Sequence, residues 1–311
     1  MALLRKEDLL AIENVLYEPK KEELVARQFL SINSNHPRYA PVIGYVWYTP
    51  TGSAKILAAG ASAKDVPFVG EEGGMETLKV YKIVTGIRYE KAEIEAVQAS
   101  ATLGKGPSIS LDTTRVSTAR RFVAETENKI AFVGDKDYNI KGILNHSGIQ
   151  YESVALGGKG STATEKKLWK NKTPQEILED LRAAKAAVEK NDIFKARVLL
   201  LDSDHYNMLL KPYSDMATIT VLQWIQSQGE FFEKIIKTSN VSKKHNCLES
   251  SQDCFVVLDN DPEIIELAVL LDMEIGNPVY DILGTSEQIV EERTAGCIIR
   301  HPSAIYVGGG I

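Results

Sequence analysis

The spacing of hydrophobic residues predicts an arm at the start of the chain. Apolar residues recur at helical spacing in two series on either side of Pro19: Leu9, Ile12 and Leu16, then Leu24, Val25 and Phe29. Two short amphipathic helices are therefore expected within residues 1–36. These positions are too few for a separate core, so we expect an arm that packs on something else.

From residue 37 the pattern becomes that of β-strands. Residues 42–48 are rich in β-branched and aromatic side chains, a turn cluster covers 49–53, and an extended pattern resumes at 54–58. A β-hairpin is expected here, followed by a glycine-rich projecting loop that returns through residues 60–75. Residues 77–90 alternate well, with Leu78 and Val80 on one face and the apolar residues from Tyr81 to Tyr89 on the other, and predict one long strand.

Helices and strands alternate in the rest of the chain. A short helix is expected over 91–99, and the longest helix runs from Asp112, as its N-cap, to Gly134. A capping box with proline at the first helical position, residues 173–176, heads a helix to about residue 190. Further helices are expected at 218–228 and 263–271, with strands at 197–202, 254–258 and 295–300. A final pair of strands, 297–301 and 304–307, is expected to return to the first half.

Composition excludes several classes of protein. The 311 residues are 44% hydrophobic and 25% charged, which is typical of a folded protein. The apolar runs are far shorter than the roughly 20 residues that cross a bilayer, and the first residues do not form a secretory signal. The net charge of −6 argues against a general nucleic-acid binder. Three cysteines without paired spacing, Cys247, Cys254 and Cys297, indicate neither a disulfide framework nor a zinc site.

Candidate chemistry is sparse. Asp202, Asp204 and His205 follow a predicted buried strand, where acid–base or metal-binding groups are often found, but no second cluster supplies further ligands. An N-cap explains the aspartates equally well. Cys247 and Cys254 flank a polar stretch and lack an identifiable activating base. No cofactor or metal is expected.

The order of these elements and the local sequence resemble tailed-phage major capsid proteins, whose Hong Kong 97-type fold is shared with encapsulins. The similar stretches, in order along the chain, are 44–48, 52–56, 63–67, 85–89, 119–121, 127–131, 134–135, 140–146, 169, 173–177 and 300–311. Together they span almost the whole chain.

The resemblance implies an α+β fold of four parts. Residues 1–36 would be the N-arm and 37–76 the extended E-loop. Residues 77–172, with 291–311 returning to them, would form the P-domain with its long spine helix, and 173–290 the α/β A-domain.

The resemblance also implies self-assembly into hexamers and pentamers of an icosahedral shell, in the virion, assembled in the host cytoplasm. Expected partners are a scaffolding protein, a portal, double-stranded DNA bound without sequence specificity, and optionally a decoration protein, but no membrane. No room is expected for a cleaved scaffolding segment before the E-loop. Lys55 is the nearest candidate for a covalent crosslink, although no partner motif is found. Residues expected at contacts between subunits are Phe29, Tyr45, Trp47, Tyr48, Pro50 and Lys55.

Two alternatives stay open at this point. An encapsulin-type nanocompartment uses the same fold, but encapsulins usually lack so long an arm. A cytosolic α/β enzyme would need Asp202, Asp204 and His205 to converge with other groups in one pocket.

Overall fold

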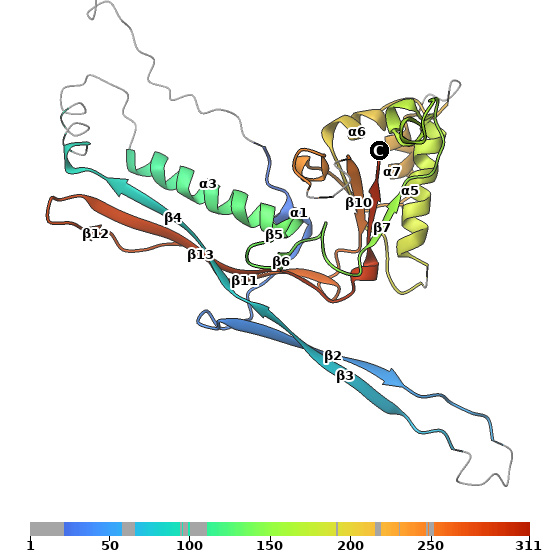
Figure 1. Ribbon diagram of the computed structural model, residues 1–311, viewed down its shortest axis with the longest axis horizontal. Helices are drawn as coiled ribbons and strands as arrows, with labels where there is room; N and C mark the ends of the chain where they lie inside the picture. Colours follow the sequence, from blue (N-terminus) through green and yellow to red (C-terminus); the bar gives the residue numbers. More distant parts are fainter. Residues whose placement is uncertain are drawn as a thin grey trace, which may run out of the picture.

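A computed structural model describes residues 22–57, 66–93, 95, 99, 111–190, 192–214, 219–229, 231–246, 248 and 252–311. Two five-stranded sheets, a long helix and a projecting hairpin organise this part of the chain (Figure 1). Its helices are α1 Ala26–Phe29, α3 Leu111–Phe132, α4 Ala163–Lys167, α5 Pro174–Val188, α6 Ser203–Met208 and α7 Val221–Ser227, with 3₁₀ turns η3 Trp169–Asn171, η4 Ser239–Val241 and η5 Pro302–Ala304.

The first sheet combines strands from both ends of the chain. Its order is β1 (Ser31–Asn33), β11 (Ile265–Ile275), β13 (Ser286–Ile299) and β12 (Val279–Tyr280), and β4 (Tyr81–Tyr89) also pairs with β13. One face is covered by α3, because alternate residues of β4 and one stripe of α3 are apolar. The buried set is Ile83, Ile87, Tyr89, Ala119, Val123, Ile130, Ile140 and Val290.

The second sheet forms a lobe with helices α5, α6 and α7. Its order is β7 (Gln150–Ser153), β14 (Ile305–Gly309), β10 (Cys254–Leu258), β8 (Val198–Leu201) and β9 (Lys234–Lys237). The four residues of β8 and the five of β10 and of β14 are all buried. Leu199 and Leu201 face a core with α5, while Val198 and Leu200 face the opposite way, toward α1 and α3. Apolar residues on both faces therefore mark a sheet covered on both sides.

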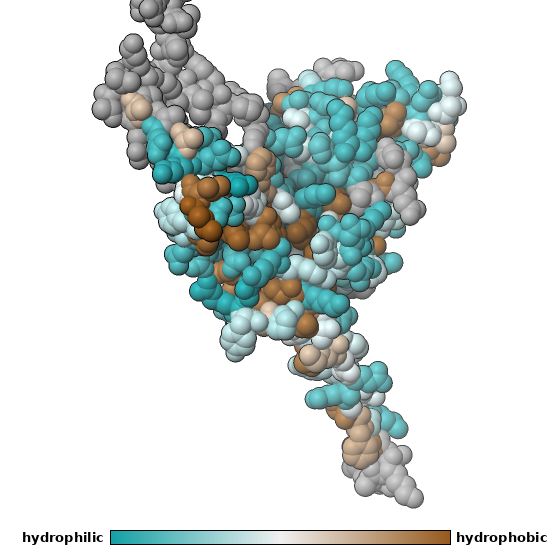
Figure 2. Space-filling model, turned by 60° about the vertical axis from the view of Figure 1, so that its left-hand side comes forward, coloured by the Kyte–Doolittle hydropathy of each residue, from teal (hydrophilic) through white to brown (hydrophobic). Residues whose placement is uncertain are grey.

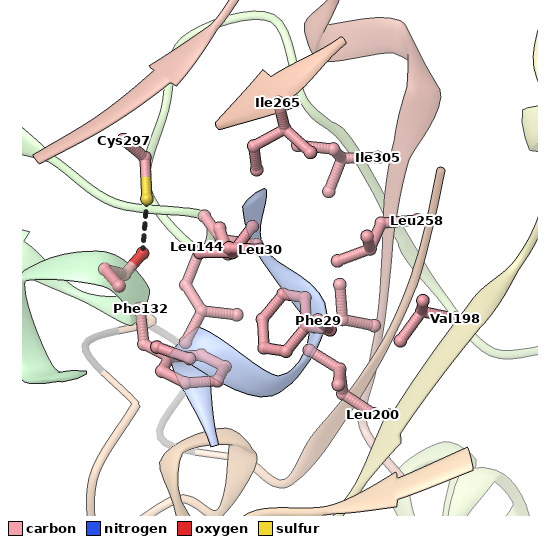
Figure 3. Close-up of a cluster of buried hydrophobic side chains, with 14 of the residues drawn as sticks. Phe29, Leu30, Phe132, Leu144, Val198, Leu200, Leu258, Ile265, Cys297 and Ile305 are labelled. Carbon is pink, nitrogen blue, oxygen red and sulfur yellow. Dashed lines mark hydrogen bonds between the residues drawn. The ribbon is translucent and has the colours of Figure 1, made fainter. Parts of the chain in front are cut away.

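The N-terminal segment helps to join the two sheets. Phe29 lies 5.8 Å from Phe132, measured between ring centroids, at the end of α3. Both rings share one buried cluster with residues of both sheets, among them Leu258, Ile265 and Ile305 (Figure 3). The backbone amides of Val25 and Ala26 donate hydrogen bonds to Oδ1 of Asn128 in α3, at 3.2 and 3.0 Å. The described end of the arm thus packs on the body of its own chain.

Several expected elements are confirmed. The long helix is α3, although it begins at Leu111, so Asp112 lies inside it and is not its N-cap. The capping box of Thr173 and Glu176 heads α5, and a similar box at Thr220 heads α7. Residues 91–93, 95 and 99 of the expected 91–99 helix are helical. The first expected helix of the arm, around 9–16, lies outside the described residues.

Three predictions of secondary structure are wrong. Residues 263–271 were expected to be helical but contribute β11, whose first six residues are all buried between covered faces. A helix would bury only one stripe, so pairing with β13 overrides the helix propensity of Glu, Leu and Ala here. The second error concerns the hairpin: β2 (Val42–Thr51) pairs with β3 (Gly70–Lys79), not with residues 54–58. The glycine-rich return is therefore a strand. The third error concerns residues 77–90, which are not one strand: 77–79 end β3, and the chain then enters β4 in the first sheet.

A sharp turn follows α3 and leads through the small pair β5 (Gly134–Asp135) and β6 (Ile140–Lys141). Gly134 has φ +70°, and a Cβ there would lie 2.1 Å from the carbonyl oxygen of Ile140. Only glycine fits this close approach, so the chain can reverse directly at the end of the helix.

Candidate assembly surfaces

The β2–β3 hairpin projects away from both sheets as an isolated two-stranded ribbon (Figure 1). Directly paired residues of antiparallel strands share one face, so the register separates its side chains into two sets. Val46 pairs with Met75 and Tyr48 with Gly73 on one face, whereas Tyr45 pairs with Glu76 and Trp47 with Gly74 on the other. The aromatic run 45–48 therefore does not form a single surface.

The first face carries a row of uncovered apolar side chains between Lys79 and Glu71, and we call this row the apolar hairpin face. It consists of Val42, Val46, Tyr48 and Met75, which are 47%, 75%, 70% and 66% exposed. Pro50 lies on the same face and is also exposed. A ribbon of two strands has no core of its own, so these side chains remain in water unless another surface covers them.

The opposite face is tied to the body at its base. Ile43 is buried against Ala268, Leu270 and Ile298 of the first sheet. The hydroxyl of Tyr45 donates a hydrogen bond to Glu76, and the Arg300 guanidinium lies 5.7 Å from the centre of its ring. Burial, and then the hydrogen bond to Glu76, raise the pKa of Tyr45 to about 12, so the phenol stays neutral. Farther out, the Trp47 indole lies over Gly74, where a Cβ would come within 2.8 Å of it.

The exposed apolar residues continue toward the far end of the hairpin. Lys55 is exposed beyond the end of β2, and Ile56 beside it is 99% exposed. Phe68 and Val69, on the way into β3, are 86% and 77% exposed. The hairpin thus carries apolar side chains along much of its described length.

One expected contact residue is wrongly assigned. Phe29 is only 3% exposed and lies in the core between the two sheets of its own chain. The helical spacing indicated correctly that Phe29 needs a partner surface, but that surface is intramolecular. Tyr45, Trp47, Tyr48, Pro50 and Lys55 all lie on the hairpin, divided between its two faces and its tip.

A second apolar surface was missed in the sequence. Strand β12 and the turn after it expose four large apolar residues within five positions, and we call this segment the β12 loop: Val279, Tyr280, Ile282 and Leu283, which are 70%, 69%, 100% and 78% exposed. Backbone hydrogen bonds between Asp281 and Thr285, and from Gly284 to Asp281, fix the turn. Figure 2 brings this end of the molecule to the front and shows hydrophobic side chains exposed on it. This surface could have been recognised in the sequence from the cluster of apolar residues between the turn residues Asn277-Pro278 and Gly284.

The candidate catalytic residues do not converge. His205 in α6 is 6% exposed and packs edge-on against Trp169, with ring centres 5.7 Å apart, and burial lowers its pKa. Its neighbour Asp204 is exposed, and Asp202 precedes the helix without a side-chain capping bond. Adjacent residues of a helix point in different directions, so the His205 imidazole faces inward while the Asp204 carboxylate faces outward.

The two described cysteines are also unsuited to catalysis. Cys254 is fully buried and its Sγ donates to the carbonyl of Val241 at 3.2 Å. Cys297 Sγ lies 3.5 Å from the carbonyl of Ala131 (Figure 3), and burial raises its pKa to about 12. Cys247 lies outside the described residues.

Across the described chain, no group of three His, Cys, Asp or Glu side chains is arranged to hold a metal ion. Nor is any helix in this part both long enough and apolar enough to span a membrane.

Comparison with solved structures identifies the fold. The capsid of Myoviridae phage XM1 covers this chain completely, with 99% of its own chain matched, a TM-score of 0.79 and 11% identity. Mycobacterium phage Bobi matches with a TM-score of 0.63 and 10% identity over 99% of this chain and 98% of its own. A virus-like particle from Pyrococcus furiosus matches less well, with a TM-score of 0.53 and 15% identity over 90% of both chains. The chain has the Hong Kong 97-type fold of tailed-phage capsids.

The family follows from the sequence itself. A family model described as major capsid protein matches residues 52–311. The chain therefore belongs to the major capsid protein family, and this selects the capsid protein among the alternatives that the sequence had left open. No curated protein sequence matches the chain.

Proposed function

We propose that copies of this chain form the closed icosahedral shell of a tailed-phage virion, built from hexamers and pentamers around double-stranded DNA. The observation that carries the proposal is the apolar hairpin face, which a single chain leaves uncovered in a family of capsid proteins. We expect a second copy of this chain to cover this face, because a shell built from one kind of subunit always brings its copies into contact.

The hairpin acts as the E-loop and lies on a neighbouring subunit. Val46, Tyr48 and Met75 supply the apolar contact, and the β12 loop supplies a second one at another part of the subunit. Many weak contacts repeated by symmetry then hold the shell together. The negative net charge fits a shell that encloses DNA without binding it tightly.

The strand pairing supports a division into four parts. Residues 1–36 form the N-arm and 37–76 the E-loop. The first sheet with α3 as spine helix forms the P-domain, and the second sheet with α5, α6 and α7 forms the A-domain. This moves the expected boundaries, because β11 and the start of β13 pair within the first sheet, while β14 pairs with β10 in the second.

A scaffolding protein and a portal assist assembly, and a decoration protein binds outside if the phage has one. The first test is negative-stain electron microscopy of the purified chain at high concentration, with light scattering after size exclusion. Closed shells, rings of five or six, or tubes are the expected result. A chain that stays monomeric or dimeric, even together with the products of its neighbouring genes, would refute the proposal.

A further inference from the structure

Four charged side chains meet where the N-terminal segment crosses α3 and the first sheet. The Arg27 guanidinium binds Glu127 of α3 at 2.8 Å, Asp272 of β11 at 3.0 Å and Glu292 of β13 at 3.4 Å. The side chains of Glu127 and Glu292 are 3% and 0% exposed, whereas that of Asp272 is 72% exposed. Two carboxylates are thus buried across the interface between helix and sheet, with one cation between them.

The buried charges do not balance unless one carboxylate holds a proton. The Nε of Arg27 also donates to Glu127, at 2.9 Å to each carboxylate oxygen. Oε2 of Glu292 is buried and has no hydrogen-bond donor among the described residues. A proton shared with Glu127 would supply that donor. Burial, and then the neighbouring Glu127, raise the pKa of Glu292 to about 8, against the opposing effect of Arg27.

The other groups that face Glu292 do not supply the missing charge. Across the ladder in β4 lies Ile83, which is apolar and buried. Farther along β13, Cys297 has a pKa of about 12 and stays neutral. Glu291, the preceding residue, points to the other face of the sheet and pairs with Lys82 at 3.0 Å.

We propose that Glu127 and Glu292 form a proton-dependent clamp between α3 and the sheet, with Arg27 as the counter-charge that ties in the N-terminal segment. With one shared proton, the pair is joined by a hydrogen bond and α3 lies firmly on β13. Without that proton, two negative carboxylates face each other in a site with little water. Their repulsion is relieved only when the interface between α3 and β13 opens and admits solvent.

The direction of the pH effect follows from proton linkage. When the interface is closed, Glu292 keeps its proton up to about pH 8; when it is open and hydrated, Glu292 titrates near the ordinary value of 4.5. The closed form therefore binds more protons between these limits. The clamp weakens as pH rises from about 4.5 to about 8 and changes little above that, by at most about tenfold per pH unit for a single proton.

Hydrogen exchange on the full chain tests the clamp, with protection factors corrected for the intrinsic pH dependence of exchange. Peptides from the second half of α3 and from residues 22–33 are expected to lose a few hundredfold in protection between pH 5 and pH 8, and then to level off. Peptides from α5 serve as the internal reference and should change less than about threefold. Light scattering at each pH verifies a constant assembly state.

Two variants and one control make the test specific. Glu292→Gln and Glu127→Gln each leave one buried carboxylate for Arg27 and remove the need for a proton, so both should flatten the pH response of α3. Glu291→Gln removes a neighbouring carboxylate on the other face and should keep the wild-type response. Constant α3 protection in the wild-type chain from pH 5 to pH 8, or an unchanged slope in Glu292→Gln, would overturn the proposal. If Glu292→Gln fails to fold, the wild-type series and Glu127→Gln decide it.

Discussion

The second sheet and the hairpin are built from similar residues, yet they end in opposite environments. In β8, β10 and β14 both faces are apolar, and every residue is buried by helices, by the first sheet or by the N-terminal segment. In the hairpin, Val46, Tyr48 and Met75 are as apolar but remain 66–75% exposed. The lobe is therefore completed by its own chain, whereas the hairpin becomes a buried element only against another subunit. Stability and assembly should consequently be separable by mutation.

The largest loss of stability is expected in the lobe. Phe255 is fully buried beside Trp169, with ring centres 5.4 Å apart. Phe255→Ala should lower the free energy of unfolding by about 3–5 kcal/mol, because it removes buried area and leaves a cavity. Chemical denaturation followed by circular dichroism measures this. The matched change on the hairpin, Tyr48→Ala, should cost less than about 0.5 kcal/mol; similar losses for both would remove the contrast between the two regions.

A somewhat smaller loss is expected from the buried ion pair of the lobe. Lys172 and Asp180 are 2.5 Å apart with side chains 1% and 4% exposed, and Asp180 also accepts a bond from the Trp169 indole at 2.9 Å. Asp180→Asn should cost about 3 kcal/mol, because it leaves Lys172 buried without a counter-charge while the indole keeps an acceptor. The exposed pair of Glu179 and Arg182 is the control, and Glu179→Gln should cost less than about 1 kcal/mol by the same denaturation measurement. Equal losses in the free energy of unfolding would mean that burial does not determine how much each ion pair stabilises the fold.

The smallest effect on stability should accompany the clearest effect on assembly. Val46→Asp places a charge on the apolar hairpin face, which is exposed in the single chain, so unfolding should change by less than about 0.5 kcal/mol. In a contact between subunits the same carboxylate would be buried without a partner, and the assembled fraction should fall at least about tenfold. Thr49→Asp adds the same charge to the other face of β2 and should assemble like the wild type in electron microscopy and light scattering. Equal assembly of both variants would show that the Val46 face is not the contact.

How far the sequence predicts the fold depends on whether local signals decide an element. The start of α5 could be predicted because Thr173, Pro174 and Glu176 form a local capping box, and α3 because its apolar stripe is long. β11 could not, because its residues favour a helix and only the ladder with β13 makes them a strand. β3 was missed because Gly70, Gly73 and Gly74 suggest a loop, whereas pairing with β2 holds them extended.

The candidate surfaces show the same limit. The aromatic run 45–48 marked the hairpin correctly, but only the register shows that Tyr48 faces away from Tyr45 and Trp47. The surface that buries Phe29 could not be predicted, because the apolar spacing shows only that the side chain needs burial and not which part of the structure covers it. Glu292 gave no signal at all: it stands in a run of charged residues, 291–293, and only the covering α3 separates it from its solvent-facing neighbour.

The place of β14 in the second sheet has a consequence for synthesis. β14 lies between β7 and β10, and Ile305 meets Phe29 in the core, so residues separated by nearly the whole chain complete one structure. Until residues 305–309 have been translated, β7 and β10 have no strand between them and the ring of Phe29 has only part of its surroundings. The lobe can close only after residues 305–309 have emerged, and such distant pairing makes folding slow. A nascent chain would thus present its hairpin before its body has formed, which makes the interval before residues 305–309 emerge the time when subunits are most prone to associate wrongly.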